Sequence, residues 1–411
     1  MYPILDMRNG IEVDEALQLL LDIPVKLKTE TVPIGDATGR ICSDKVDALI
    51  PFPPFNRSPF DGYAIRGEDT VLATEDSPVT LIVSQEIPAG FTPKEAVDAG
   101  FAAKILTGAP IPSGANAVIK FEETEFTENS VKIFKPVKPD SNIVRAGEDI
   151  DVGTVILHPG DVIGPAAIGL LAAQGLSKVN VYKKPVVSVV NTGTELSELG
   201  QPLPPGKIYN SSMYTLQGFI KRTGAEFRDG GIVEDDNAII AERIKNELAV
   251  SDMVITTGGA SVGDYDCSLA AAEYAGAEIF FWKIKMRPGG SLLAYTIGEK
   301  LVIALSGNPG AAVLGLLIFG VPCIKKRAGF ANVMFEECSV RLTADEKKTS
   351  PVKRIKRGYL KISDGEAFFI ENEGQGGGDI SSLVNCDLLV EIPGGSQLLT
   401  AGALVKAYRV F

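Results

Sequence analysis

Histidine is almost absent from this chain of 411 residues, which contains a single one, His158. His158 stands before a Pro-Gly pair in a turn-like stretch, where a lone histidine is more often structural than catalytic. Catalytic arrangements of the Ser-His-Asp or Cys-His kind are therefore disfavoured. An enzyme of this composition would have to work with carboxylates, cations, backbone amides and a metal ion.

Cysteine is also sparse, and the five cysteines are scattered singly without a CxxC pair. This spacing disfavours a zinc site or a disulfide framework and suits a reducing compartment, so we expect a cytoplasmic protein. The start, MYPILDMRNG, lacks a basic segment followed by an apolar one, and we expect no secretory signal. The longest apolar run, residues 311–324, is short for a membrane span and predicts a buried helix.

Positive charge is in deficit, because 40 Lys and Arg residues face 52 Asp and Glu residues and leave a net charge of -12. Such a field repels phosphate backbones and anionic lipids, so we expect neither nucleic acid nor membrane as a partner. Any anionic ligand must be held by a local arrangement. No GxGxxG follows a strand and no GxxxxGK[ST] occurs, which disfavours dinucleotide dehydrogenases and P-loop NTPases.

Residues 185–325 show strands alternating with helices, and the strands are apolar on both faces. This pattern predicts an α/β domain with a doubly wound parallel sheet that is covered by helices on both sides. The predicted strands are 185–193, 230–235, 252–259, 278–286 and 300–307, with helices at 211–224, 237–249 and from residue 311.

Four polar segments follow these strands and so lie at one carboxyl edge, where open α/β sheets bind ligands: NTGTE, VEDD, TTGGASVGDYD and SGNPG. Backbone amides there can hold a phosphate-like oxygen, while aspartates hold a divalent cation that neutralises it. For Asp264 and Asp266 we favour this role slightly over a structural one. Asp236 precedes a helix and is equally an ordinary N-cap, and Glu195 is exposed by default at a strand end.

The rest of the chain has a different texture, which makes the predicted protein an α/β multidomain one. Helices near 11–22 and 165–174 with short strands between them predict an elongated α+β domain. Residues rich in strands and turns predict an inserted β-domain and a small terminal β-barrel or sandwich, of which we favour the barrel. The predicted boundaries are 1–53 with 141–183 for the elongated domain, 54–140 for the β-domain, 184–327 for the α/β domain and 328–411 for the barrel.

Several further motifs are weak when taken singly. Asp61 before glycine, Thr107 in a Thr-Gly-Ala-Pro turn, and Arg145 near Asp149 favour turns or a solvated charge cluster. The cations at 283, 285 and 287 alternate along a predicted strand, so we expect them on one face, as an anion contact or as a solvated strand end. The basic run 353–357 predicts a surface strand.

The following motifs occur in this order along the chain: DGYA, TGAP, GEDI, TGTEL, TGGASVGDYD, WKIKMRPG and SGNP. Together they resemble the motifs of the molybdopterin molybdenumtransferase family, the MoeA proteins, whose relatives include the gephyrin E domain. The resemblance covers essentially the whole chain. It implies insertion of molybdenum from molybdate into adenylylated molybdopterin with release of AMP, and dependence on a divalent cation such as Mg²⁺. It also implies a homodimer whose cleft draws on both subunits, with a molybdopterin adenylyltransferase acting upstream.

The resemblance also implies roles for individual residues. The catalytic set would be Asp61, Thr107, Asp149, Glu195, Lys283 and Arg287. The substrate-binding set would be Arg145, Gly258, Gly259, Ser261, Ser306, Gly307, Asn308 and Pro309. The metal ligands would be Asp236 (or Asp235), Asp264 and Asp266.

Two departures from the family pattern leave alternatives open. Where the family reads KPGKP, this chain reads Arg287-Pro-Gly-Gly-Ser, so that one lysine becomes arginine and the other is lost at Gly290. Where the family reads PGNP, this chain has Ser306 in place of the first proline. Fewer cations predict weaker anion binding. A non-catalytic molybdopterin-binding or scaffolding homologue, or a paralogue handling tungstate, are the alternative interpretations.

Overall fold

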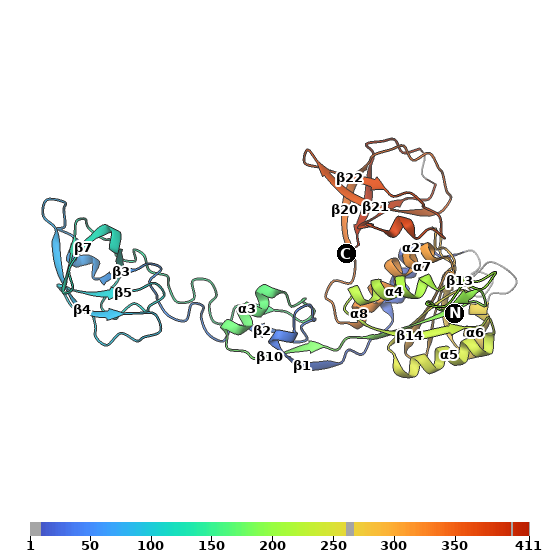
Figure 1. Ribbon diagram of the computed structural model, residues 1–411, viewed down its shortest axis with the longest axis horizontal. Coiled ribbons are helices and arrows are strands. Elements are labelled where there is room, and N and C mark those ends of the chain that lie inside the picture. The colour runs from blue at the N-terminus through green and yellow to red at the C-terminus, as the bar shows by residue number, and fades with distance from the viewer. Residues whose placement is uncertain (1–9, 260–266, 396–397, 411) are drawn as a thin grey trace.

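The computed structural model describes residues 10–259, 267–395 and 398–410, which form an elongated molecule (Figure 1). A β-sheet lies at one end, and an α/β body with a β-barrel beside it lies at the other. Helix α3 and two short strand pairs lie between the two ends. The chain passes outward and back through this middle part, so the end with the single sheet is an insertion in the sequence.

The α/β body is built on a six-stranded sheet in the order β14-β11-β15-β19-β18-β16. The first four strands are parallel, whereas β18 and β16 are antiparallel to their neighbours. The doubly wound fold is confirmed, and the antiparallel edge is an addition to it. The strands are β11 (Val186–Thr192), β14 (Glu226–Val233), β15 (Met253–Thr257), β16 (Glu278–Trp282), β18 (Leu293–Ile297) and β19 (Lys300–Leu305).

Helices cover both faces of this sheet because successive strand residues point to opposite sides. Val254 and Val302 pack against one helical layer, while Ile255 and Ile303 pack against the other. The first layer holds α5 (Asn237–Val250) and α6 (Cys267–Ala275). The second holds α4 (Ser211–Arg222) and a helix formed by α7 (Pro309–Gly315), the π-helical η4 (Leu316–Gly320) and α8 (Val321–Arg327).

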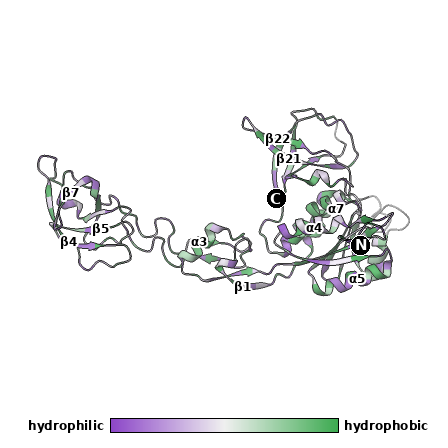
Figure 2. Ribbon diagram, viewed as in Figure 1, coloured by the Kyte–Doolittle hydropathy of each residue, from purple (hydrophilic) through white to green (hydrophobic). Residues whose placement is uncertain are grey.

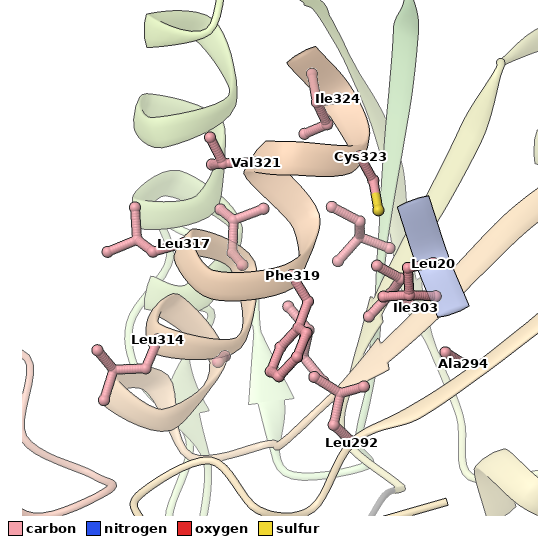
Figure 3. Packing of buried hydrophobic residues seen from close by; sticks show 14 of the residues in the cluster. Leu20, Leu292, Ala294, Ile303, Leu314, Leu317, Phe319, Val321, Cys323 and Ile324 are labelled. Atoms are coloured by element: carbon pink, nitrogen blue, oxygen red, sulfur yellow. The ribbon is translucent and has the colours of Figure 1, made fainter. Parts of the chain in front are cut away.

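The predicted apolar helix is the centre of the second layer. Residues Pro309–Arg327 form a helix long and apolar enough to cross a membrane by composition, but 78% of its most apolar window is buried inside the protein. Figure 3 shows Phe319 of this helix pointing toward Leu292, and Figure 2 shows its hydrophobic character at α7. The prediction of a buried helix is confirmed.

Helix α2 (Val13–Asp22) also packs on this layer, through Val13, Ala16, Leu17 and Leu20. Leu20 lies beside Ile303 in Figure 3. The predicted boundary at residue 53 assigned this helix to the elongated domain and not to the α/β body. The amphipathic pattern of the helix shows that one of its faces is buried, but not which surface covers that face. The predicted domain boundaries stay predictions.

The middle part consists of α3 (Pro165–Ala173) and two antiparallel pairs, β1 (Thr29–Pro33) with β10 (Lys178–Tyr182) and β2 (Val46–Asp47) with β9 (Val155–Leu157). His158 follows β9 in an exposed turn, where its Nδ1 is 3.6 Å from an Asp161 carboxylate oxygen. The β-sheet at the end of the molecule opposite the α/β body, called here the distal sheet, has the strand order β6-β3-β5-β4-β8-β7. Its strands are β3 (Gly62–Ile65), β4 (Val79–Ile87), β5 (Phe101–Ile105), β6 (Ala117–Lys120), β7 (Thr124–Phe126) and β8 (Ser130–Ile133).

The C-terminal strands close into a five-stranded barrel, since β21 pairs with both β22 and β23. A short strand of the α/β body, β17 (Met286–Arg287), extends this sheet by pairing with β21. The barrel prediction is confirmed, but the surface-strand prediction for 353–357 is wrong, because Arg354 and Arg357 are buried. The barrel strands are β20 (Glu336–Leu342), β21 (Lys353–Ser363), β22 (Glu366–Glu371), β23 (Leu388–Ile392) and β24 (Leu404–Arg409).

Candidate functional site

Asp61 and Thr107, which are far apart in the sequence, meet at the distal sheet. Asp61 Oδ1 accepts hydrogen bonds from the Thr107 backbone N at 2.7 Å and from Thr107 Oγ1 at 2.8 Å. These two bonds, the backbone one foremost, favour the ionised carboxylate and lower the pKa of Asp61. Asp61 is therefore an exposed carboxylate with a fixed orientation.

The glycine after Asp61 is required by packing. A Cβ atom at Gly62 would lie 2.0 Å from the carbonyl oxygen of Ile119 in the neighbouring strand β6. Only glycine lets β3 approach β6 this closely. The Asp-Gly pair thus combines a glycine that packs with an aspartate that faces solvent.

Arg145 and Asp149 lie in the double-stranded neck between the distal sheet and the middle part. The Arg145 guanidinium is 2.5 Å from Asp140 Oδ1, and its backbone N donates to Glu148 Oε2 at 2.8 Å. The Asp149 backbone N donates to the Phe52 carbonyl at 3.1 Å. Arg145 is thus part of a solvated charge cluster, as its exposure also indicates.

At the other end of the molecule, the loops after β11, β15 and β19 meet through their backbones. Gly258 has a φ of +94°, and a Cβ atom there would lie 2.2 Å from the Thr192 carbonyl oxygen. A Cβ atom at Gly307 would lie 3.3 Å from the Gly258 Cα. The predicted convergence at the carboxyl edge is confirmed for these three loops, and glycine is what allows it. Ser261, Asp264 and Asp266 lie outside the described residues.

Acidic side chains border this edge. Asp235 Oδ2 accepts a hydrogen bond from the Thr194 backbone N at 3.4 Å, which places it beside the loop that carries the exposed Glu195. Asp236 Oδ1 accepts from the backbone N atoms of Ala238 and Ile239 at 3.0 and 2.9 Å. Asp236 is therefore the N-cap of α5, as its position before a helix predicted.

The donor chemistry at this edge suits Mg²⁺, which prefers carboxylate oxygens. Asp236 uses one oxygen as a cap, and its second makes no hydrogen bond to the described residues. Among residues 10–259, 267–395 and 398–410, however, no three His, Cys, Asp or Glu side chains gather into a metal-binding group. The described residues alone therefore do not form a metal site at this edge.

The prediction that three cations share one strand face is wrong. Strand β16 ends at Trp282, and Lys283 has a left-handed φ of +78° with its Nζ 4.5 Å from the Trp282 ring centroid. Lys285 Nζ is 2.9 Å from Glu12 Oε1. Arg287 is exposed and has no ion pair with a described residue, so it is the member of the group that is available to an anion.

The barrel contributes a loop that sequence reasoning missed. Residues 374–379, called here the barrel loop, follow β22 and contact both RPGG and SGNPG. The Gly377 carbonyl accepts a hydrogen bond from Ala311 N at 2.8 Å. A Cβ atom at Gly377 would lie 3.6 Å from a Pro288 Cβ and 3.7 Å from an Asn308 Cβ. The run of glycines at 376–378 was the available signal, but it resembled an ordinary turn between barrel strands.

Comparisons with known proteins follow the same division of the chain. Residues 11–175 match the family described as the MoeA N-terminal region (domain I and II), and residues 188–326 match a probable molybdopterin binding domain. A molybdopterin molybdenumtransferase of Staphylococcus aureus (strain COL) is 33% identical over 98% of this chain and 96% of its own length. The chain belongs to the MoeA family.

A solved MoeA protein has the same fold over nearly the same length. The molybdopterin biosynthesis MoeA protein from Pyrococcus horikoshii OT3 is 32% identical, with a TM-score of 0.83 over 98% of this chain and 100% of that chain. A second curated relative, from Staphylococcus epidermidis (strain ATCC 12228), is 32% identical over 97% of this chain and is also named molybdopterin molybdenumtransferase. The relatives carry an enzyme's name, which confirms the prediction of an enzyme family.

The local structure accommodates both departures of this MoeA-family chain from the family pattern, at Gly290 and at Ser306. A Cβ atom at Gly290 would lie 2.6 Å from the Met286 carbonyl oxygen and 2.8 Å from that of Ile284, so a lysine has no room there. Ser306 Oγ accepts a hydrogen bond from Asn308 N at 3.2 Å and so shapes the turn before α7. Arg287 therefore has no neighbouring lysine at 290 to share an anion with.

Within one MoeA-family chain, the two groups of predicted site residues do not meet. Asp61 and Thr107 belong to the distal sheet, whereas the loops of Glu195, Gly258 and Asn308 belong to the α/β body at the opposite end (Figure 1). A common site for both groups needs a second chain.

Proposed function

We propose that this protein inserts molybdenum from molybdate into adenylylated molybdopterin and releases AMP. The observation that carries the proposal is similarity over nearly the full length to curated enzymes named molybdopterin molybdenumtransferase. The carboxyl edge of the sheet supports it, because glycine loops and an exposed Arg287 offer amides and a cation to anionic groups. The compartment that we propose is the cytoplasm.

The reaction brings together two anions, molybdate and the pyrophosphate link of the adenylylated pterin. Amides of the loops after β15 and β19, together with the Arg287 guanidinium, would bind the phosphate oxygens and stabilise charge as AMP departs. We propose Asp235 or Asp236, with Asp264 or Asp266, as holders of Mg²⁺. The ion would supply charge neutralisation between the two anions.

We propose a homodimer in which the distal sheet of one chain faces the α/β body of the other. The separation of Asp61 and Thr107 from the carboxyl edge supports this arrangement, since one chain alone leaves the set divided. The ionised Asp61, fixed by Thr107, would then complete the polar wall of the site. The upstream partner would be a molybdopterin adenylyltransferase, because the substrate must arrive adenylylated.

A turnover assay tests the proposal. The purified protein is mixed with adenylylated molybdopterin, molybdate and Mg²⁺, and the release of AMP and the formation of molybdenum cofactor are measured. Asp61→Ala is expected to abolish both while the protein stays folded, because the carboxylate is exposed and the two bonds that it loses are both to Thr107. Asp76→Ala, an exposed aspartate of the same sheet's loops, is the control that keeps activity.

The outcomes of this assay separate the alternatives. AMP release that stops with a chelator and returns with Mg²⁺ supports a metal-dependent transferase. Pterin binding without AMP release would instead indicate a scaffolding homologue, which the missing cation at Gly290 favours. Faster turnover with tungstate than with molybdate would indicate a paralogue for that oxyanion.

A further inference from the structure

Arg357 in β21 is a completely buried arginine, with 0% of its surface exposed, and it has no carboxylate partner among the described residues. Its Nη1 donates to the Asp379 carbonyl at 3.0 Å, and its Nη2 donates to the carbonyls of Gly376 and Gly374 at 2.8 and 3.2 Å. Its Nε makes no hydrogen bond within the described chain. Burying a cation is costly, so its retention calls for an explanation.

The bonds of Arg357 all lead to the barrel loop and the segment just before it. Its backbone N donates to Gln375 Oε1 at 2.9 Å, and its carbonyl accepts from Gln375 Nε2 at 2.8 Å. Asp379 closes the loop from within, since its Oδ2 accepts from Gly376 N at 2.7 Å. Arg354, three residues earlier in the same strand, differs because it pairs with the buried Glu346 inside the barrel.

The Nη1 end of this guanidinium, which bonds to the Asp379 carbonyl, also lies against the first turn of α7. A Cβ atom at Gly310 would lie 2.6 Å from Arg357 Nη1 and 2.6 Å from the Asp379 carbonyl oxygen. Gly377, held between these contacts, bonds to Ala311 and packs on Pro288 and Asn308. The barrel loop is thus fixed between Arg357 and two loops of the candidate site.

We propose that Arg357 is a positioning residue of the site. Through the barrel loop, it sets the position of the Arg287–Gly290 turn relative to the start of α7. It touches no substrate itself, and its effect on substrate rests on the proposed function. A merely structural arginine would stabilise the barrel as a whole, whereas these bonds stabilise a loop that contacts the site.

The first experiment measures hydrogen exchange of the substrate-free protein. Arg357→Met removes the charge and the donors but keeps most of the volume, and is expected to speed amide exchange in the barrel loop and at Ala311 by at least about tenfold. Arg327→Met is the matched control. Arg327 is also buried and donates to a backbone carbonyl, that of Cys323, in α8, at the far end of the helix that begins with α7. It is expected to leave exchange in the barrel loop unchanged.

A second variant keeps the test decisive if Arg357→Met does not fold. Gly310→Ala should press on Arg357 and Asp379 from the α7 side and speed the same amides, because its Cβ would overlap both. Gly378→Ala is its control, since a Cβ there meets nothing within 4 Å. Unchanged exchange in the barrel loop, or an increase spread evenly over all barrel strands, would overturn the proposal.

The kinetic readout separates positioning from stability. Arg357→Met is expected to raise the KM for adenylylated molybdopterin at least about tenfold, with a smaller change in kcat, and Arg357→Lys is expected to restore part of the loss. A lower kcat with an unchanged KM would count against the proposal. If the wild type releases no AMP, the proposed function fails, and the exchange experiment alone then decides the role of Arg357.

Discussion

Asp61 and its neighbours show how one dipeptide can satisfy two requirements. The sequence favoured an ordinary Asp-Gly turn, and Gly62 is indeed fixed by packing against Ile119. The contact with Thr107 could not be predicted from local pattern, because the two residues are brought together by the antiparallel pairing of β3 with β5 and by backbone bonds of Ser58 to Gly108 and Ala109. The resemblance to a family pointed to both residues as site residues. The structure shows that they are connected by two hydrogen bonds.

A test of this connection is Thr107→Val, which removes the hydroxyl bond to Asp61 and keeps the backbone bond. The folded-state pKa of Asp61 is lowered by these bonds, so their stabilising effect is present above the unfolded pKa and is lost as pH falls through the folded one. Losing one bond raises the pKa of Asp61. The acidic limb of the pH profile of kcat/KM is expected to move to higher pH.

The control for this prediction is Thr124→Val in the same sheet. The Thr124 hydroxyl donates to the Phe121 carbonyl at 2.9 Å and does not contact Asp61. The acidic limb of the kcat/KM profile of the Thr124→Val variant should match that of the wild type. If both variants give the same limb, Asp61 is not the group that titrates there.

Strands at the sheet edge show why some elements were predicted incorrectly. Residues 278–286 are apolar enough for one long strand, yet β16 ends at Trp282 and pairs with the antiparallel β18. The segment between these strands carries Lys283, Lys285 and Arg287, but it is not one continuous strand. Lys283 has a left-handed φ and Arg287 belongs to the short β17, so the period-two rule does not span the three residues. The parallel strands were predicted more successfully because burial on both faces leaves them a continuous apolar run.

Helix α5 offers a test of whether Asp236 does more than cap it. Asp236→Ala is expected to lower the free energy of unfolding by about 1 kcal/mol, whereas Asp236→Asn should preserve it, because asparagine caps equally well. If Asp236 also binds Mg²⁺, Asp236→Asn will raise the Mg²⁺ concentration needed for half-maximal activity. Urea unfolding and a magnesium titration of AMP release measure the two effects.

Asp229→Asn provides the comparison for this prediction. Asp229 accepts a bond from Gly231 N within β14 and lies upstream of the carboxyl edge. The Asp229→Asn substitution should leave the Mg²⁺ concentration needed for half-maximal activity unchanged. An Asp236→Asn protein with the same requirement as the wild type would leave Asp236 as a cap alone.

The elongated shape of the molecule governs how its parts can form one site. Motif order along the chain indicated the residues but not their separation, because the distal sheet is an insertion that carries Asp61 and Thr107 away from the α/β body. A paired arrangement brings such groups together when one chain's insertion faces the other chain's sheet edge. Two-fold pairing would generate two equivalent sites.

Complementation between variants tests this arrangement. Asp61→Ala and Arg287→Ala chains are each expected to be inactive alone. In a mixed dimer with shared sites, one site carries both substitutions and the other carries neither. Random pairing makes half of the dimers mixed, each with one intact site, so the co-expressed mixture should recover about a quarter of wild-type activity.

The pair Asp61→Ala with Asp61→Asn should recover none, because both substitutions remove the same carboxylate and every site then contains a defect. Sites built within single chains predict a different result for the first pair. Each chain would keep its own defect whatever its partner, so the mixture would stay inactive. Recovery by the first pair and not by the second therefore requires that the Asp61 of one chain serves the Arg287 of another.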